Sequence, residues 1–164
     1  MVEIPDAIER ICDEIAGERD PARIARAIYG GVTALMPVTF VAVFAFDPVG
    51  HKLQRYSIEN GREVPFTEFD LTEIESNAAL AARTRAEVHI NAEEGARPGS
   101  RIPGTETTRS LWFGPMFQDA RLMGVLSVQS SRLGAYGERE KAMLRILADC
   151  VGRTLSQARV AQQR

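Results

Sequence analysis

The chain has 164 residues, of which 45% are hydrophobic, and its 20 lysines and arginines face 22 acidic residues, for a net charge of −2. A chain of this length can fold as one domain without a metal or a disulfide, and we expect a single domain over residues 1–164. The charge balance gives no electrostatic footprint for nucleic acid. We find no signal-peptide pattern, and the longest apolar run, residues 34–46, is too short to span a bilayer. We therefore expect a cytoplasmic domain that makes no membrane contact.

Two helices are predicted at the amino-terminal end. In residues 1–18, isoleucines at spacings of four and three form one narrow stripe, which is typical of a seam between helices. These isoleucines are Ile4, Ile8, Ile11 and Ile15. The second helix begins with Asp20 as N-cap and stops before Pro37. Glycine costs helix stability, so the pair Gly30-Gly31 inside this helix predicts close packing against a sheet.

Residues 39–46 and 51–58 are predicted to form a β-hairpin. The first segment, TFVAVFAF, is apolar on both sides, as in a buried strand. The residues between the two segments, Asp-Pro-Val-Gly, have turn chemistry. Alternation along the first strand places Val41, Val43 and Ala45 on one face and Ala42, Phe44 and Phe46 on the other.

The middle of the chain is less regular. Residues 64–71 contain a proline and two phenylalanines and are predicted to be an apolar loop folded onto the domain. Thr72 and Glu75 resemble a capping box for a helix through Ala82, and residues 87–90 are a candidate short strand. Residues 91–108 lack periodicity, and a stretch of that length is usually either a functional lid or disordered. The sequence leaves both interpretations open.

The last third of the chain carries the strongest pattern. Residues 110–129 hold two apolar runs around a short polar break, which predicts a hairpin that is buried on both faces and central in its sheet. Residues 137–164 are predicted to form one long exit helix. Its apolar residues alternate spacings of three and four, like a coiled-coil seam. The seam residues are Leu144, Leu147, Val151 and Leu155.

This order of elements, and the motif at its end, resemble a GAF domain. The motif consists of Ser110-Leu111, Gly114-Pro115-Met116, the run MGVLSV at 123–128, Tyr136, and a helix with Leu144, Leu147 and Ala148. The resemblance covers residues 20–159 and implies an α+β, profilin-like fold. In that fold a central antiparallel sheet carries the terminal helices on one face. Loops and short helices cover a small-molecule pocket on the other face.

The GAF resemblance also implies which residues line the pocket. The candidates are Phe44, Phe46, Tyr56, Ile58, Arg101, Arg109, Trp112, Ser127 and Gln129. The two arginines either clasp an anionic ligand, because guanidinium groups bind carboxylate or phosphate bidentately, or are solvated loop charges. Aromatic residues such as Phe44 and Trp112 are also common in ordinary cores, so both interpretations stay open.

Several chemistries of the GAF superfamily lack their residues in this chain. Bilin attachment and free methionine sulfoxide reduction both imply a cysteine in or beside the pocket, and none lies between Cys12 and Cys150. The two histidines, His51 and His89, sit in separate segments and give no haem or metal ligand set. No hydrolase or metalloprotease motif occurs. We therefore expect no catalysis, no cofactor and no metal.

The resemblance implies a non-catalytic sensory module of a signalling protein, such as a sensor histidine kinase of a two-component system or a cyclic-di-GMP enzyme. A small molecule in the pocket would shift the terminal helices. These helices would pass the change to an effector domain through a homodimeric seam made of the two stripes described above. The alternative is a structural dimerisation module without a ligand, whose aromatic side chains fill its own pocket. A small redox enzyme, which needs thiol chemistry, is a third hypothesis.

Overall fold

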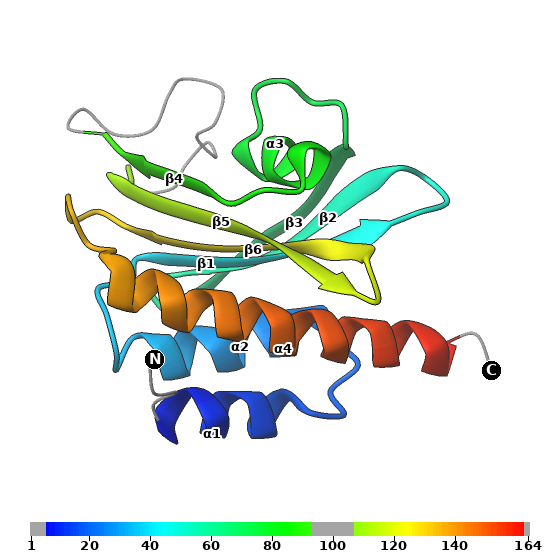
Figure 1. The fold of residues 1–164 in the computed structure, drawn as a ribbon, viewed down its shortest axis with the longest axis horizontal. Helices are drawn as coiled ribbons and strands as arrows, with labels where there is room; N and C mark the ends of the chain where they lie inside the picture. Colours follow the sequence, from blue (N-terminus) through cyan, green and yellow to red (C-terminus); the bar gives the residue numbers. More distant parts are fainter. Residues whose placement is uncertain (1–5, 93–106, 163–164) are drawn as a thin grey trace.

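The computed structural model describes residues 6–92 and 107–162, and in these residues it shows one six-stranded antiparallel sheet with helices on both faces (Figure 1). The strands are β1 (Phe40–Asp47), β2 (Lys52–Glu59), β3 (Arg62–Asp70), β4 (Val88–Asn91), β5 (Ser110–Gln118) and β6 (Arg121–Ser130). The helices are α1 (Asp6–Ile15), α2 (Pro21–Val32), α3 (Asn77–Thr84) and α4 (Glu138–Gln162). The strand order is β3-β2-β1-β6-β5-β4. The predicted α+β architecture is confirmed.

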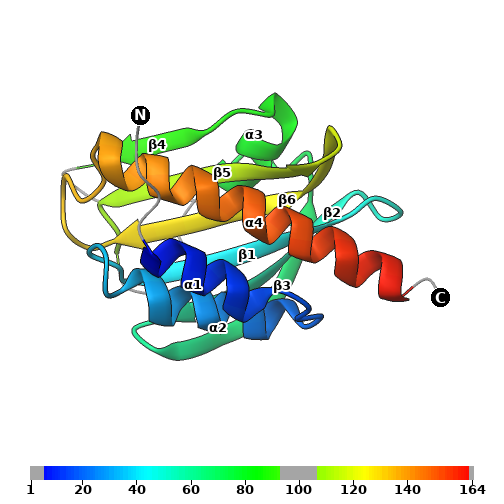
Figure 2. The same ribbon diagram turned by 60° about the horizontal axis from the view of Figure 1, so that its bottom comes forward.

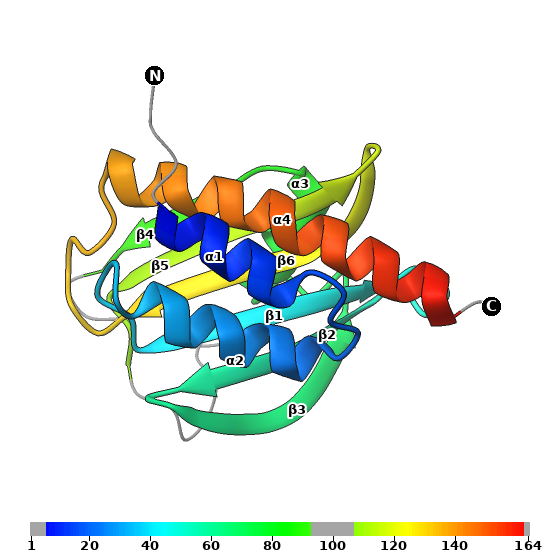
Figure 3. The ribbon, with the colours of Figure 1, turned by 90° about the horizontal axis from the view of Figure 1, so that it is seen from below.

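The helices divide unequally between the two faces of the sheet. Helices α2 and α4 pack directly on one face, which we call the helix face, and α1 lies outside them in contact with both (Figures 2 and 3). Helix α3 lies on the opposite face, the α3 face, where it contacts β4, β5 and β6 (Figure 1). In the described part of the chain, no helix is long and apolar enough to cross a lipid bilayer.

Each face of the sheet has its own apolar core. The predicted alternation along β1 is confirmed for residues 41–44, because Val41 and Val43 belong to the helix-face core and Ala42 and Phe44 to the α3-face core. On the α3 face the alanines of α3 allow close approach, and they pack with Leu53, Leu111, Phe113 and Val125. β1 and β6 are therefore buried from both sides.

The two predicted dimer stripes are buried inside one chain. On α1, Ile8, Ile11 and Ile15 are at most 3% exposed, because they pack into the layer formed by α2 and α4. On α4, Leu144, Leu147, Val151 and Leu155 are likewise buried in the helix-face core. The prediction of a homodimeric seam through these residues is therefore wrong, because the spacing reflected a helix layer within the domain. Ile4 lies outside the described residues.

Two predictions for the middle of the chain are also wrong. Residues 64–71 do not form a loop, because Asn60 and Gly61 both adopt positive φ angles, of 47° and 83°, and reverse the chain into β3. Pro65 is tolerated because β3 is an edge strand with a bulge opposite Arg55 and Ser57. The helix that follows is capped by Ser76, whose Oγ accepts from the Ala79 N–H at 3.1 Å, and not by Thr72.

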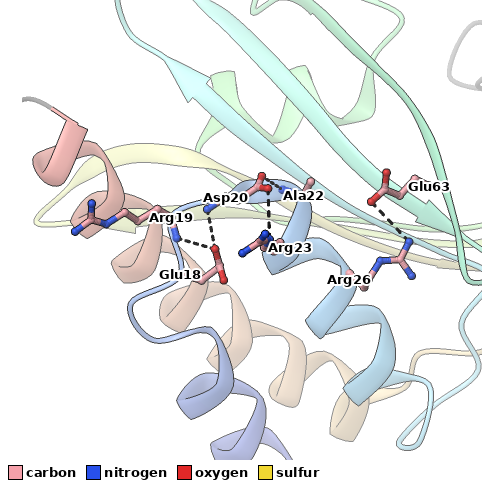
Figure 4. Close-up of polar contacts among 7 residues, drawn as sticks. All are labelled: Glu18, Arg19, Asp20, Ala22, Arg23, Arg26 and Glu63. Carbon is pink, nitrogen blue, oxygen red and sulfur yellow. Dashed lines mark hydrogen bonds and ion pairs between the residues drawn. The ribbon is translucent and has the colours of Figure 1, made fainter.

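The turn between α1 and α2 is held by local polar contacts (Figure 4). The Asp20 carboxylate accepts from the Ala22 N–H at 3.0 Å, which confirms Asp20 as the N-cap of α2. Glu18 accepts from the backbone N–H groups of Arg19 and Asp20. Further along α2, Arg26 pairs with Glu63 at 3.7 Å (Figure 4) and so connects the helix to the edge strand β3.

The glycine pair in α2 does not pack against the sheet as predicted, because only Gly31 makes a close contact, and that contact is with α1. A Cβ built on Gly31 would lie 2.3 Å from Cγ1 of Ile11, whereas a Cβ on Gly30 meets nothing within 4 Å. We expect Gly31→Ala to lower the free energy of unfolding by about 1–3 kcal/mol through overpacking. Gly30→Ala is the matched control and should raise it by about 0.5–1 kcal/mol through helix propensity. Urea unfolding measures both, and equal stabilisation by the two variants would contradict the packing of α1 on α2.

Candidate functional site

A short chain of polar side chains lies on the α3 face, whose core is apolar. The Thr108 hydroxyl donates to Oε1 of Gln129 at 2.8 Å, and Nε2 of Gln129 donates to the Ser127 hydroxyl at 2.8 Å. All three residues are buried, with exposed fractions of 9% or less. Buried polar groups need partners, and these three satisfy one another at the centre of the sheet.

The sheet register surrounds this polar chain with small and aromatic residues. Ala42 on β1 stands between Ser57 on β2 and Ser127 on β6, so the middle of the α3 face is a row of three small side chains. Phe40 and Phe44 stand in the neighbouring rows along β1. Side chains directly opposite on paired strands lie about 5 Å apart. The α3 face therefore combines an apolar surface with a few polar groups, as small-molecule sites do.

One charged residue is buried beside this row. Arg55 on β2 is paired with Phe44 in the sheet register and is 8% exposed. Its Nη2 donates to the carbonyl oxygen of Pro65 at 3.0 Å, which the bulge in β3 brings close. Burial lowers the pKa of the guanidinium below its ordinary value. Arg55 thus adds a cation to the α3 face.

The predicted pocket residues divide between the two faces. Phe44, Phe46, Ser127 and Gln129 lie on the α3 face, and whether they bind a ligand stays a prediction. Tyr56, Ile58 and Trp112 were expected on the same face, and that placement is wrong, because all three pack in or against the helix-face core. In β2 the register of the hairpin turns Leu53, Arg55 and Ser57, and not their neighbours, toward α3.

Trp112 serves the attachment of α4 to the sheet. Its ring occupies the space that a side chain on Gly114 would need, 2.2 Å from a built Cβ. Its indole N–H donates to Oε1 of Glu87, and Glu87 also accepts two hydrogen bonds from Arg145 on α4, at 3.1 and 2.8 Å. Burial opposes ionisation of Glu87, but the hydrogen bonds from Arg145 and Trp112 lower the pKa of this carboxyl. Trp112 is therefore a structural residue.

Of the two predicted arginines, Arg109 alone lies in the described part of the chain. Arg109 is exposed at the start of β5, where its backbone N–H donates to the Ser130 carbonyl at 2.8 Å. Arg101 lies outside the described residues, as does most of the expected lid at 91–108. The polar residues Arg55, Ser57 and Thr108 of the α3 face were not predicted. Alternation along residues 53–57, which places Arg55 and Ser57 on the same face as Leu53, could have identified these two residues.

Within residues 6–92 and 107–162, two hollows lie on the helix side of the sheet. One, of about 460 Å³, lies between the turn after β1 and the end of α4 and is lined by Ala45, Phe46, Tyr56, Leu155 and Arg159, among others. There Nη2 of Arg159 donates to the Phe46 carbonyl at 2.6 Å. The other, of about 600 Å³, runs between α1 and α2. Among the residues that the structure describes, no group of three or more histidine, cysteine or acidic side chains is placed to hold a metal ion.

The two cysteines of the chain lie together on the helix side. Cys12 on α1 and Cys150 on α4 are free thiols that share a hydrogen bond. Burial, and then this hydrogen bond, raise the pKa of the Cys150 thiol well above its ordinary value of 9.0. The sheet separates both thiols from the α3 face.

The raised pKa predicts slow alkylation of Cys150. At pH 8 an ordinary cysteine is partly thiolate, but a raised pKa keeps Cys150 protonated, and the thiol is also 8% exposed. We expect iodoacetamide to modify Cys150 in the folded Cys12→Ser variant at least about tenfold more slowly than in the urea-unfolded chain. Mass spectrometry gives both rates. Equal rates at pH 8 would show that Cys150 is neither buried nor stabilised as the thiol.

The sheet and the helices on its two faces define the class of α+β domains with a central antiparallel sheet. The chain belongs to the GAF domain family, whose model matches residues 18–156. GAF domains are generally ligand-binding regulatory modules within larger proteins. The resemblance noted in the sequence is therefore confirmed.

Solved structures show the same fold at low identity. The GAF domain of the phosphoenolpyruvate-protein phosphotransferase from Acinetobacter is 20% identical, with a TM-score of 0.79, and the match covers 94% of this chain and 93% of that one. The corresponding domain from Coxiella burnetii is 15% identical, with a TM-score of 0.81 and coverage of 97% and 96%. The free methionine-R-sulfoxide reductase of Neisseria meningitidis, solved with its substrate, is 21% identical, with a TM-score of 0.69 and coverage of 94% and 89%. A search of curated proteins found no match.

Proposed function

We propose that this GAF domain is a non-catalytic sensor that binds a small molecule on its α3 face. The observation that carries the proposal is the buried polar chain Thr108–Gln129–Ser127 on an apolar surface. Side chains of this kind fix the orientation of a ligand in a pocket lined mainly by apolar groups. A thiol-dependent enzyme is disfavoured, because Cys12 and Cys150 lie across the sheet from this surface.

The binding signal would leave the domain through α4. Ser127 faces the α3 side, while its neighbours on β6, Leu126 and Val128, belong to the helix-face core that α4 shares. Helix α4 contacts both β5 and β6, and a Cβ on Gly152 would lie 3.0 Å from the Phe117 carbonyl. A ligand that shifts β6 therefore displaces the surface on which α4 rests. Such a shift transmits a signal only if the ligand prefers one of two arrangements.

The effector belongs to a larger signalling protein of the cytoplasm, such as a histidine kinase or a cyclic-di-GMP enzyme. Dimerisation through the buried isoleucine and leucine stripes is not part of this proposal. The alternative is a ligand-free structural module, in which Phe40, Phe44 and Phe113 of the α3-face core, with Phe46 and Phe69 packed against it, would supply the aromatic filling. Tyr56 and Trp112 pack on the helix face, and Phe66 is 55% exposed.

A thermal-shift screen of metabolites tests the proposal. A compound present at 100 times its dissociation constant stabilises the domain by about 2.7 kcal/mol, which raises the Tm by about 5–10 °C for a domain of this size. We expect Gln129→Leu, which keeps the volume of the side chain but removes its hydrogen bonds, to weaken a hit about tenfold or more.

The matched control for this screen is Tyr56→Phe, which removes one hydroxyl from the hollow on the helix side. We expect it to leave the affinity unchanged. The proposal fails if the hits respond to Tyr56→Phe and not to Gln129→Leu, or if purified protein neither retains nor binds any compound.

A further inference from the structure

Two neighbouring residues on the α3 face of β2 carry buried polar atoms without partners. Among the residues that the structure describes, Nε of Arg55 and Oγ of Ser57 have no hydrogen-bond partner, although the two residues are only 8% and 4% exposed. Buried polar groups in folded proteins are nearly always paired. An unpaired donor on a buried cation is the more costly of the two. The unmade hydrogen bonds therefore need an explanation.

Residues 6–92 and 107–162 do not supply a counter-charge for Arg55. In this part of the chain the ion pairs formed by acidic residues involve other cations. The contact of Arg55 seen there is the one from Nη2 to the neutral Pro65 carbonyl. A guanidinium stays charged in proteins, and a buried charge is normally paired.

The residues next to Arg55 and Ser57 form an apolar surface on which the carbon skeleton of a small ligand could lie. Phe44 and Ala42 stand opposite Arg55 and Ser57 on β1, and Ser127 stands on the far side of Ala42. Helix α3 packs over β4, β5 and β6, on the other half of the sheet. Arg55 and Ser57 therefore supply two donors at one side of an apolar surface, and the Ser127–Gln129 pair supplies further polar groups across it.

We propose that Arg55 and Ser57 form an anion-binding subsite on the α3 face, which takes the carboxylate or phosphate group of a small organic ligand. Nε of Arg55 and the Ser57 hydroxyl donate to the anionic oxygens, and the carbon skeleton lies on Ala42 and Phe44. A guanidinium fits the planar oxygens of such groups. This subsite rests on the proposed sensor function and narrows its ligand to anions.

The Nε–Hε signal of Arg55 in a ¹⁵N NMR spectrum of the whole domain reports directly on this subsite. Its assignment comes from its loss in Arg55→Lys. The probes are sodium phosphate and sodium glutarate, with glycerol as the neutral control, in a buffer that contains neither anion. We expect a saturable shift with phosphate or with glutarate and none with glycerol. Comparison of the two titrations distinguishes a phosphate from a carboxylate ligand.

Variants separate binding from folding. We expect Arg55→Gln to raise the apparent dissociation constant of the effective anion about tenfold or more, because it removes hydrogen bonds to a charged group. Ser57→Ala should weaken binding by a smaller factor. In anion-free buffer the Tm of Arg55→Gln should be at least that of the wild type, because a buried charge is removed. A large drop in Tm would show instead that Arg55 serves the fold, and would overturn the proposal.

The backbone NMR signals of Ser127 and Gln129 distinguish a failure of the anion subsite from a failure of the sensor function. If a screening hit moves these signals while the Arg55 Nε–Hε signal stays fixed with that hit and with both anions, the subsite is wrong and the sensor function stands. If neither set of signals moves with the anions or with any compound of the screen, both proposals are wrong.

Discussion

Gly124→Ala is expected to be the most destabilising single-methyl change in the sheet, lowering the free energy of unfolding by about 3 kcal/mol. Gly124 sits on β6 opposite Ala45 of β1, with a φ of 155°. A Cβ there would lie 1.9 Å from the carbonyl oxygen of Phe44. That atom is backbone and cannot rotate away, so β1 and β6 would have to separate at the centre of the sheet.

Urea unfolding followed by the fluorescence of Trp112, the only tryptophan, measures this effect. Gly137→Ala is the control, because its Cβ would meet only the flexible Glu140 carboxylate, at 3.3 Å. We expect that control to lower the free energy of unfolding by no more than about 1 kcal/mol, because Gly137 is the N-cap of α4 and alanine caps less well than glycine. A Gly124→Ala variant as stable as the wild type would contradict the close approach of the two central strands.

Leu147→Ala is expected to lower the free energy of unfolding by about 2–5 kcal/mol without changing the association state of the folded protein. Leu147 on α4 is 0% exposed and belongs to the helix-face core, so the substitution leaves a cavity within one chain. Arg153→Ala, at an exposed position of the same helix, is the matched control and should lie within about 0.5 kcal/mol of the wild type.

Urea unfolding gives the stability of the Leu147→Ala and Arg153→Ala variants, and sedimentation equilibrium gives their mass in solution. If Leu147→Ala turned a dimer into a monomer of unchanged stability, the coiled-coil spacing of α4 would mark an interface between chains after all. The structure predicts a loss of stability without a change of mass, because the leucines at this spacing pack inside one chain.

Much of the fold was predictable because its signals are local. The N-cap at Asp20 follows from the residues at the start of α2. The β1–β2 and β5–β6 hairpins follow from apolar runs separated by short polar turns. The edge strand β3 was missed because Pro65 and its irregular apolar pattern suggested a loop. Whether a narrow helical stripe packs within a chain or between chains depends on the tertiary arrangement, which spacing alone does not contain.

The candidate site was only half predictable, for a reason specific to each strand. On β6, Ser127 and Gln129 stand out as polar residues in an apolar strand, and they lie on the α3 face. On β2 the face depends on the hairpin register, in which Asp47 pairs with Lys52. If the register of this hairpin shifted by one residue, Tyr56 would face the α3 side in place of Arg55. On β5 both faces are apolar, so alternation did not separate Trp112 from Leu111 and Phe113.

The measurement that tests the account most directly is a two-dimensional ¹H–¹⁵N NMR map of the domain with a compound that raises its Tm. The account predicts the largest backbone shifts on β1 and β6 around Ala42 and Ser127, on the α3 face, with smaller shifts along α4. Shifts confined to Ala45, Leu155 and Arg159, which line the hollow on the helix side, would contradict it.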